Sequence, residues 1–225
     1  MEIGPIWRAM MRNKTGAILI ALQISVTMAI MVNAISIMQE KGRMMSRPSG
    51  LDEHNIFTIL SQGFAEDFNE RVTIEEDLAA LRAMPGVVAA MQSNSVPLSG
   101  SGWSMGLQTE AGAEIDATGV GLFFVDEHAL DTFGVNLVGG ENFSATDIVW
   151  REPGDTGWPG KTIITLAMAE ALYPDDPQSA LGKTVYINDD EPITITGIID
   201  KMQGAWPGWD GFERVMLVPS HTLFN

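Results

Sequence analysis

Residues 15–38 form a run of 24 amino acids without a charged side chain. At a rise of about 1.5 Å per residue, a helix of this length measures roughly 36 Å and can cross a hydrocarbon core of about 30 Å with some tilt. The apolar region of a cleaved signal peptide is about 7 to 15 residues long and precedes a small-residue cleavage site, whereas this run is longer and continues into Gln39, Glu40 and Lys41. The run therefore predicts an uncleaved transmembrane helix over residues 15–38.

Charge divides the chain near residue 48. Six of the 13 basic residues, but only Glu2 and Glu40 of the 29 acidic ones, precede this position, so the rest of the chain carries 7 basic and 27 acidic side chains. A domain this acidic repels nucleic acid and anionic lipid surfaces, and we expect a cationic or neutral partner instead. The chain has no cysteine and thus no disulfide framework, but a domain without thiols is compatible with a periplasm.

Residues 1–14 are expected to form an amphipathic helix that lies in the membrane interface. Their apolar side chains recur at the spacing of one helical face. These membrane-interface residues are Ile3, Ile6, Trp7, Met10 and Met11. Arg8 and Arg12 fall outside this face, and a tryptophan beside basic residues suits the headgroup zone. The alternative is a basic flank with no interfacial role.

Small and polar residues recur along one stripe of the predicted span, at intervals of 7, 4 and 7 residues. They are Gly16, Gln23, Thr27 and Ala34. A stripe of this kind gains little from facing lipid and is typical of a surface that packs on other transmembrane helices. The alternative is a simple anchor that tolerates an isolated Gln and Thr.

A stalk or linker is expected over residues 39–50, ended by Pro48 and Gly50, and a domain over residues 51–225. Thr73 and Glu76 have the spacing of a capping box, which predicts a helix whose buried side carries Ile74, Leu78, Leu81 and Met84 and which stops at Pro85 and Gly86. Further helices are expected over 126–133, capped by Asp126 and stopped by Gly134, and over 167–172. Strands are expected over 55–60, 87–93, 104–109, 115–125, 161–166, 183–188, 193–199 and 214–218. The irregular order predicts an α+β domain, with one or two subdomains, rather than a doubly wound sheet.

No catalytic, cofactor or metal site is predicted. Ser104 lies in a G-x-S-x-G match, followed by Asp200 and His221 in the order of a hydrolase triad, but the elbow needs a strand before the serine and a helix after it, whereas a loop and a strand are expected here. His54, His128 and His221 show no zinc spacing. Acidic turns at 175–176 and 189–191 are typical of solvated loops. A P-loop sequence is lacking, so ATP hydrolysis would require another chain.

Four tryptophans lie in Gly- or Pro-containing segments that are expected to be loops. They are Trp103, Trp158, Trp206 and Trp209. One interpretation is a contact surface for a partner, and the other is a set of anchors that fold back over the core.

Several phrases, in this order, resemble the MacB-like and FtsX-like permeases of ABC transport systems. The phrases cover residues 81–87, 124–134 with 139–143, 169–173, 180–183 and 195–200. Gly139, Gly140 and Glu141 depart from the Gly-Arg pair that is usual in the family, and Trp-rich insertions occupy 150–160 and 203–212.

The resemblance implies an ABC permease subunit, built from an interfacial helix, a first span and a MacB-like periplasmic core domain. It also implies that at least three later spans and the C-terminal end of the domain are missing from this fragment. The expected setting is a bacterial inner membrane with a cytoplasmic N-terminus, an orientation that the charge count leaves open because three basic residues flank the span on each side. Implied partners are the lipid bilayer, an ABC ATPase subunit, a second permease subunit, and a periplasmic adaptor or substrate. The alternative function is a singly anchored extracytoplasmic sensor or binding domain.

Overall fold

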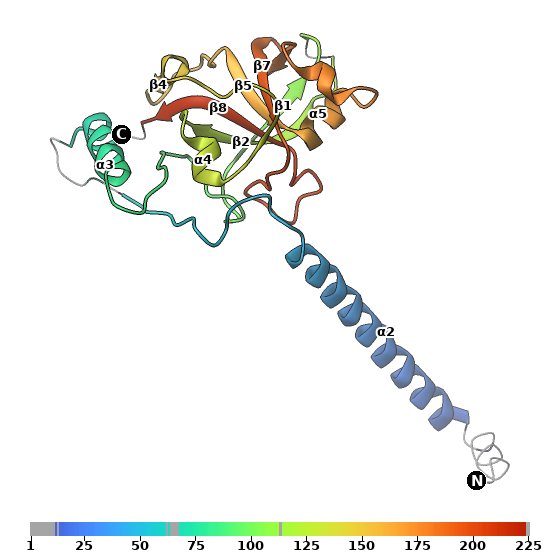
Figure 1. Cartoon of the computed structure of the whole chain (residues 1–225). Helices are drawn as coiled ribbons and strands as arrows, with labels where there is room; N and C mark the ends of the chain where they lie inside the picture. Colours follow the sequence, from blue (N-terminus) through green and yellow to red (C-terminus); the bar gives the residue numbers. More distant parts are fainter. Residues whose placement is uncertain (1–11, 13, 62, 64–67, 113, 224–225) are drawn as a thin grey trace. The chain divides into compact units, whose positions relative to one another are not determined.

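The computed structural model describes residues 12, 14–61, 63, 68–112 and 114–223, and the chain divides into two compact units, Met1–Arg47 and Pro48–Asn225. In the first unit, the helix α2 (Lys14–Met45) contains the whole run at 15–38 and continues beyond it to Met45 (Figure 1). It has 32 residues and is long and apolar enough to cross a membrane. The predicted interfacial residues Ile3 to Met11 lie outside the described residues.

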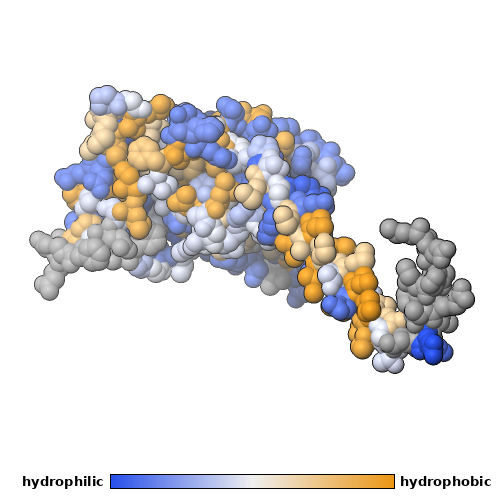
Figure 2. All heavy atoms as spheres, turned by 90° about the horizontal axis from the view of Figure 1, so that it is seen from below, coloured by the Kyte–Doolittle hydropathy of each residue, from blue (hydrophilic) through white to orange (hydrophobic). Residues whose placement is uncertain are grey.

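Between residues 15 and 38, most side chains of α2 are apolar and exposed. None of its residues is buried, and Figure 2 shows apolar side chains along its length. A long helix that exposes so many apolar side chains belongs in a lipid environment or among other helices. The Thr27 hydroxyl donates a hydrogen bond to the Gln23 carbonyl oxygen at 2.8 Å, and Ser25 bonds Ala21 in the same way. The predicted packing stripe therefore presents Gln23, rather than Thr27, as its polar group.

The second unit is a mixed β-sheet that closes on itself. Its strands are β1 (Trp103–Gln108), β2 (Thr118–Val125), β3 (Leu137–Gly140), β4 (Val149–Arg151), β5 (Lys161–Thr165), β6 (Thr184–Ile187), β7 (Glu191–Ile199) and β8 (Val215–Thr222). Neighbours follow the order β2-β1-β6-β7-β5-β8, and a parallel β2–β8 pairing closes the ring. β3 pairs with β7, and β4 extends the sheet beside β8. The prediction of an α+β domain is confirmed.

Two hydrophobic cores lie on opposite faces of this sheet because successive strand residues point to opposite sides. In β2, Leu122 and Phe124 belong to the first core, whereas Phe123 and Val125 belong to the second. Every strand of the ring contributes to the first core, which therefore fills its interior. The second core lies outside the ring, where α4 (Ala129–Phe133) covers it. Strands β2 and β8 are buried on both faces, as is usual for parallel pairs.

The other helices flank the ring. α5 (Leu166–Leu172) follows β5 directly, and the Thr165 side chain caps it by accepting a hydrogen bond from the Met168 N–H. Short 3₁₀ turns lie at Ala145–Asp147 and Pro177–Ala180. α4 ends at Gly134 in the left-handed conformation, with φ of 67°, as the sequence predicted.

The capping-box prediction was wrong. α3 (Glu70–Arg82) begins one turn earlier, because the Asn69 side chain accepts a hydrogen bond from the Val72 N–H and caps the helix there. Leu78 is its only buried side chain, and Met84 is 51% exposed. The second predicted cap also moved: His128, not Asp126, is the N-cap of α4.

The predicted strands at 55–60 and 87–93 were wrong as well. Both segments are irregular, and exposed apolar side chains such as Phe57 and Val88 mark them. β-propensity acts only where a neighbouring strand pairs with the segment, and the described chain offers none there. Conversely, β3 and β4 were not predicted, because β3 ends in two glycines, which are rare in strands, and β4 has only three residues.

Candidate functional site

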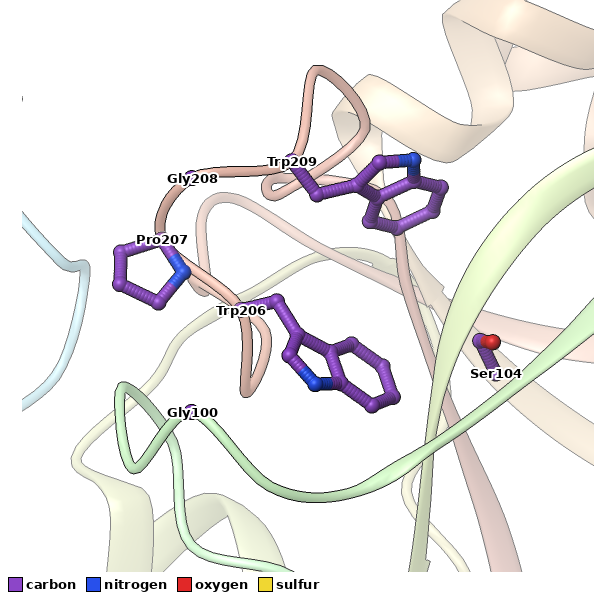
Figure 3. Close-up of a pocket in the computed structure, with 6 residues that line it drawn as sticks. All are labelled: Gly100, Ser104, Trp206, Pro207, Gly208 and Trp209. Atoms are coloured by element: carbon purple, nitrogen blue, oxygen red, sulfur yellow. The ribbon is translucent and has the colours of Figure 1, made fainter.

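Two loops lie side by side outside the ring and border an open pocket. The Leu98 N–H donates to the Gly204 carbonyl at 3.0 Å, and the Gly100 N–H donates to the Ala205 carbonyl at 2.8 Å, so the loop before β1 runs beside the loop after β7. The open pocket between them measures about 650 Å³ (Figure 3). Its lining comprises Gly100, Ser104, Trp206, Pro207, Gly208 and Trp209. We call this the Trp206/Trp209 pocket.

Both indole side chains of the pocket are half-buried, and each packs against other parts of the domain. Trp206 packs against the second core. The ring of Trp209 lies so close to Gly119 and Gly211 that a Cβ atom at these positions would come within 2.9 and 2.5 Å of its Cζ2 atom. The Arg214 guanidinium lies 5.3 Å from the centroid of the Trp209 ring. Because Gly119 and Gly211 have no side chain, the Trp209 ring has space to pack there and form one wall of the pocket.

Trp103 and Trp158 lie at a different place. Phe124 contacts Trp103 edge-on at 5.7 Å between ring centroids and stacks on Trp158 at 6.1 Å. The Arg151 guanidinium lies 5.2 Å from the Phe124 centroid and 4.8 Å from that of Trp158. Burial among these rings lowers the pKa of Arg151. The four tryptophans therefore form two separate groups, and that of Trp158 packs on the core inside the ring.

Strand alternation explains this separation. Trp103 is opposite Leu122, whose side chain points into the ring, while the next residue, Ser104, points outward into the Trp206/Trp209 pocket. Ser104 lies inside β1, so it does not occupy the strand-to-helix turn that a hydrolase nucleophile needs.

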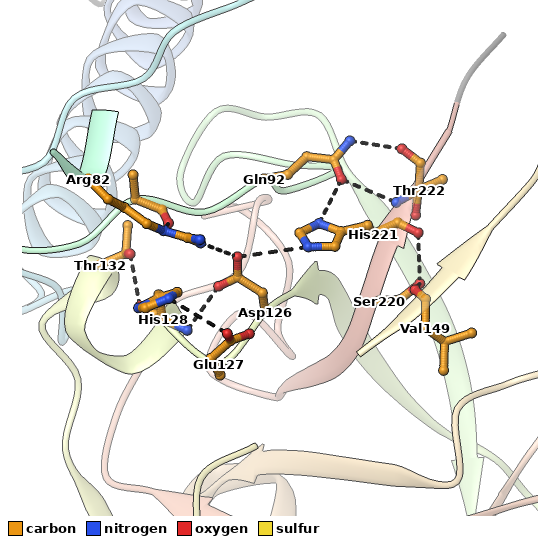
Figure 4. Close-up of polar contacts among 11 residues, drawn as sticks. Arg82, Gln92, Asp126, Glu127, His128, Thr132, Val149, Ser220, His221 and Thr222 are labelled. Atoms are coloured by element: carbon orange, nitrogen blue, oxygen red, sulfur yellow. Dashed lines mark hydrogen bonds and ion pairs between the residues drawn. The ribbon is translucent and has the colours of Figure 1, made fainter. Parts of the chain in front are cut away.

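A second site, which is polar, lies where α3 meets the ends of β2 and β8 (Figure 4). Asp126 is 1% exposed, and its Oδ2 atom accepts a hydrogen bond from Arg82 Nη2 at 2.6 Å. Its Oδ1 atom accepts from the His128 backbone N–H at 2.9 Å. His221 Nε2 lies 4.0 Å from the same Oδ2 atom. We call Arg82, Asp126, His221 and Gln92 the Asp126 cluster.

Gln92 holds His221 from the other side. Its amide donates to the Thr222 carbonyl at 2.8 Å, and its Oε1 atom accepts from the Thr222 N–H at 3.2 Å. These bonds fix the amide orientation, so the Oε1 atom faces His221 Nδ1 at 3.2 Å and accepts its proton. Trp150 covers the imidazole at 4.5 Å between centroids. Burial lowers the pKa of His221 and outweighs the opposite effect of Asp126.

All seven basic side chains after residue 48 are engaged by an acidic or aromatic side chain. The pairs are Arg71–Glu75, Arg82–Asp126, Arg151–Trp158, Lys161–Asp147, Lys183–Tyr173, Lys201–Glu213 and Arg214–Trp209. The hydrogen bond from Lys161, at 2.8 Å, lowers the pKa of Asp147 to about 2. The large acidic excess is therefore left to face solvent and partners.

Sequence reasoning missed the Arg82–Asp126 pair, because 44 positions separate its members. A usable signal was that both residues fall within phrases on which the family resemblance rests. The three histidines do not converge, and the described residues contain no group of three or more His, Asp or Glu side chains that could hold a metal ion.

A family model for the MacB-like periplasmic core domain matches residues 16–224. A comparison with curated proteins finds no match. Among solved structures, the extracellular domain of the noncanonic ABC-type transporter YknZ from Gram-positive bacteria is similar, with 23% identity over 65% of this chain and 62% of that chain, at a TM-score of 0.42. The periplasmic region of MacB from Actinobacillus actinomycetemcomitans shows 16% identity over 64% of this chain and 54% of that chain, also at 0.42. The chain thus spans less than two thirds of the length of either domain.

Proposed function

Because the chain belongs to the MacB-like periplasmic core domain family, we propose that it is part of a permease subunit of an ABC transport system. In this proposal, a separate ATPase subunit hydrolyses ATP, and the domain outside the membrane passes the resulting motion to an exported substrate or an adaptor. The supporting observation is that the family match begins inside α2 and continues to the end of β8, so one family unit includes both the apolar helix and the ring.

The proposed mechanism is mechanical. α2 is one unbroken helix of 32 residues that continues seven residues beyond position 38. A continuous helix transmits a shift at one end to the other, so motion at the cytoplasmic ATPase would move the extracytoplasmic end of α2. The stripe of Gly16, Gln23, Thr27 and Ala34 would pack on further spans, including those of a second permease subunit. We place the protein in a bacterial inner membrane, with its N-terminus in the cytoplasm.

The test of this function uses the permease purified from its native membrane. We expect an ATPase subunit to copurify, and deletion of residues 3–11 to reduce transport at least tenfold while ATP hydrolysis continues, because the interfacial segment would carry the coupling. Transport assays in proteoliposomes measure this directly. Unchanged transport would reject the coupling role, and a permease that copurifies without any ATPase would favour the singly anchored sensor.

The Trp206/Trp209 pocket is the proposed contact site for an adaptor protein. Two fixed indoles beside glycine and proline give an apolar anchor point, and aromatic anchors dominate the energetics of protein interfaces. Since every basic side chain of the domain is engaged internally, we assign the partner a basic surface, with attraction that weakens as salt is added.

Trp209→Ala is expected to weaken adaptor binding at least tenfold, because it removes one wall of the pocket. Trp158→Ala is the matched control: Trp158 packs on the core inside the ring, so we expect a lower melting temperature and unchanged binding. Titration calorimetry and thermal unfolding provide the two readouts. Equal loss of affinity in both variants would contradict a specific contact at Trp209.

A further inference from the structure

We propose that His221 is a pH-sensitive latch, whose protonation at Nε2 releases α3 and the following segment, residues 69–94, from the closed sheet. The proposal rests on the geometry of the Asp126 cluster and is independent of the transport function. It concerns an opening of part of the domain, not its complete unfolding.

Both ends of α3 are fastened around His221. Arg82, in the last turn, binds Asp126, whose Oδ2 atom faces the imidazole. Arg71, in the first turn, lies 4.8 Å from the centroid of Trp150, which covers the other side of the imidazole. Gln92 adds a third attachment through Thr222. Since Leu78 is the only buried side chain of α3, these contacts carry much of its attachment.

The tautomer of His221 leaves one nitrogen without a proton. Gln92 Oε1 accepts the proton of Nδ1, so Nε2 carries a lone pair that points toward the Asp126 carboxylate at 4.0 Å. A neutral ring gains nothing from this carboxylate, whose Oδ2 atom already binds Arg82. Nε2 is therefore the atom that takes up a proton when the pH falls.

Burial makes this uptake unfavourable while the segment is closed. The charged groups that face the ring are Asp126 and Glu127 after β2, and Arg71, Glu75 and Arg82 on α3. Desolvation outweighs the three carboxylates and lowers the pKa of His221 below its ordinary value of 6.5. In the open state the ring is hydrated and regains the ordinary pKa. The open state thus binds the proton more tightly, so closure is favoured above about pH 6.5 and is weakened as the pH falls below it.

The closed interface also contains unsatisfied polar groups that opening would hydrate. Three of the five buried side-chain atoms without a hydrogen-bond partner in the described part of the protein lie here: Ser93 Oγ, Asn94 Nδ2 and Thr222 Oγ1. Burying such groups without partners opposes closure. Opening therefore hydrates these three groups, which adds to the stabilisation of the open state by the proton on His221.

Amide hydrogen exchange of residues 70–82, measured on the full chain in detergent, tests the latch. After correction for the intrinsic pH dependence of exchange, we expect the opening constant of α3 to rise between pH 7.5 and 5.5, by at most about tenfold per pH unit for a single proton. His221→Asn keeps a donor near Gln92 but cannot be protonated, so its opening constant should not depend on pH. His128→Asn, at a half-exposed histidine, should behave like the wild type.

A pH-independent wild type, or a His221→Asn variant that retains the pH dependence, would overturn the proposal. Should His221→Asn not fold, His221→Gln replaces it. Histidine titration by NMR on the wild type gives a separate decision: the pKa of His221 must lie below the ordinary histidine value of 6.5, and an equal or higher pKa would refute the latch.

Discussion

Gly140→Ala is expected to destabilise the domain by about 3–5 kcal/mol, because the new Cβ atom would have no space and the backbone no alternative conformation. Gly140 ends β3 with φ of 77°, and a Cβ atom there would lie 2.1 Å from the Thr196 carbonyl oxygen and 2.9 Å from Gly197 Cα. Both obstacles are backbone atoms of the central strand β7, so no side-chain rotation relieves the clash. In a domain of this size, the loss corresponds to a decrease of roughly 6–20 °C in melting temperature.

Gly182→Ala is the matched control for this prediction. Gly182 has nearly the same φ, 75°, but a Cβ atom there meets nothing within 4 Å. The control isolates the cost of a left-handed alanine, about 1–2 kcal/mol. Differential scanning fluorimetry of both variants of the full chain separates conformational strain from steric clash. Equal melting temperatures would show that β3 moves away from β7 at little cost.

Local signals predicted the local parts of this fold. Gly134 ended α4 because a glycine after an apolar turn favours the left-handed conformation, and the strands that became β1, β6 and β7 showed the alternation of a sheet. The same local logic failed at Thr73, since a capping box is a pattern that several positions can satisfy. Asn69 caps α3 instead, and no rule of spacing ranks the two.

The long-range strand pairings could not be predicted from the sequence, for a physical reason. The parallel pairing of β2 with β8 joins segments far apart in the chain, and no periodicity within either strand identifies its neighbour. The tryptophans show the same limit. Residues 103 and 104 are adjacent in sequence, yet the alternation of β1 sends them to opposite faces, so the register of one strand decides which tryptophans share a site.

The Asp126 cluster leads to the second prediction. Arg82→Met leaves the Asp126 carboxylate 1% exposed without its cationic partner. Breaking a buried ion pair from one side costs about 3–5 kcal/mol, and we expect about 2–3 kcal/mol here because the Arg82 side chain is 31% exposed. Arg71→Met, in the same helix, removes an ion pair whose members are both 54% exposed together with the contact to Trp150, and it should cost about 1 kcal/mol, less than Arg82→Met.

A double-mutant cycle distinguishes a true pair from two independent losses. Asp126→Asn removes the buried charge and keeps the shape of the side chain, so Arg82→Met should cost less in the Asp126→Asn background than in the wild type. The expected coupling energy is about 1–3 kcal/mol from denaturant unfolding at pH 7.5, where His221 is neutral in the closed state. Additive effects would mean that Arg82 stabilises α3 through its hydrogen bond to the Ala90 carbonyl, at 2.9 Å, rather than through Asp126. In that case Arg82 would fasten α3 to the loop that follows it, rather than to the carboxylate that faces His221.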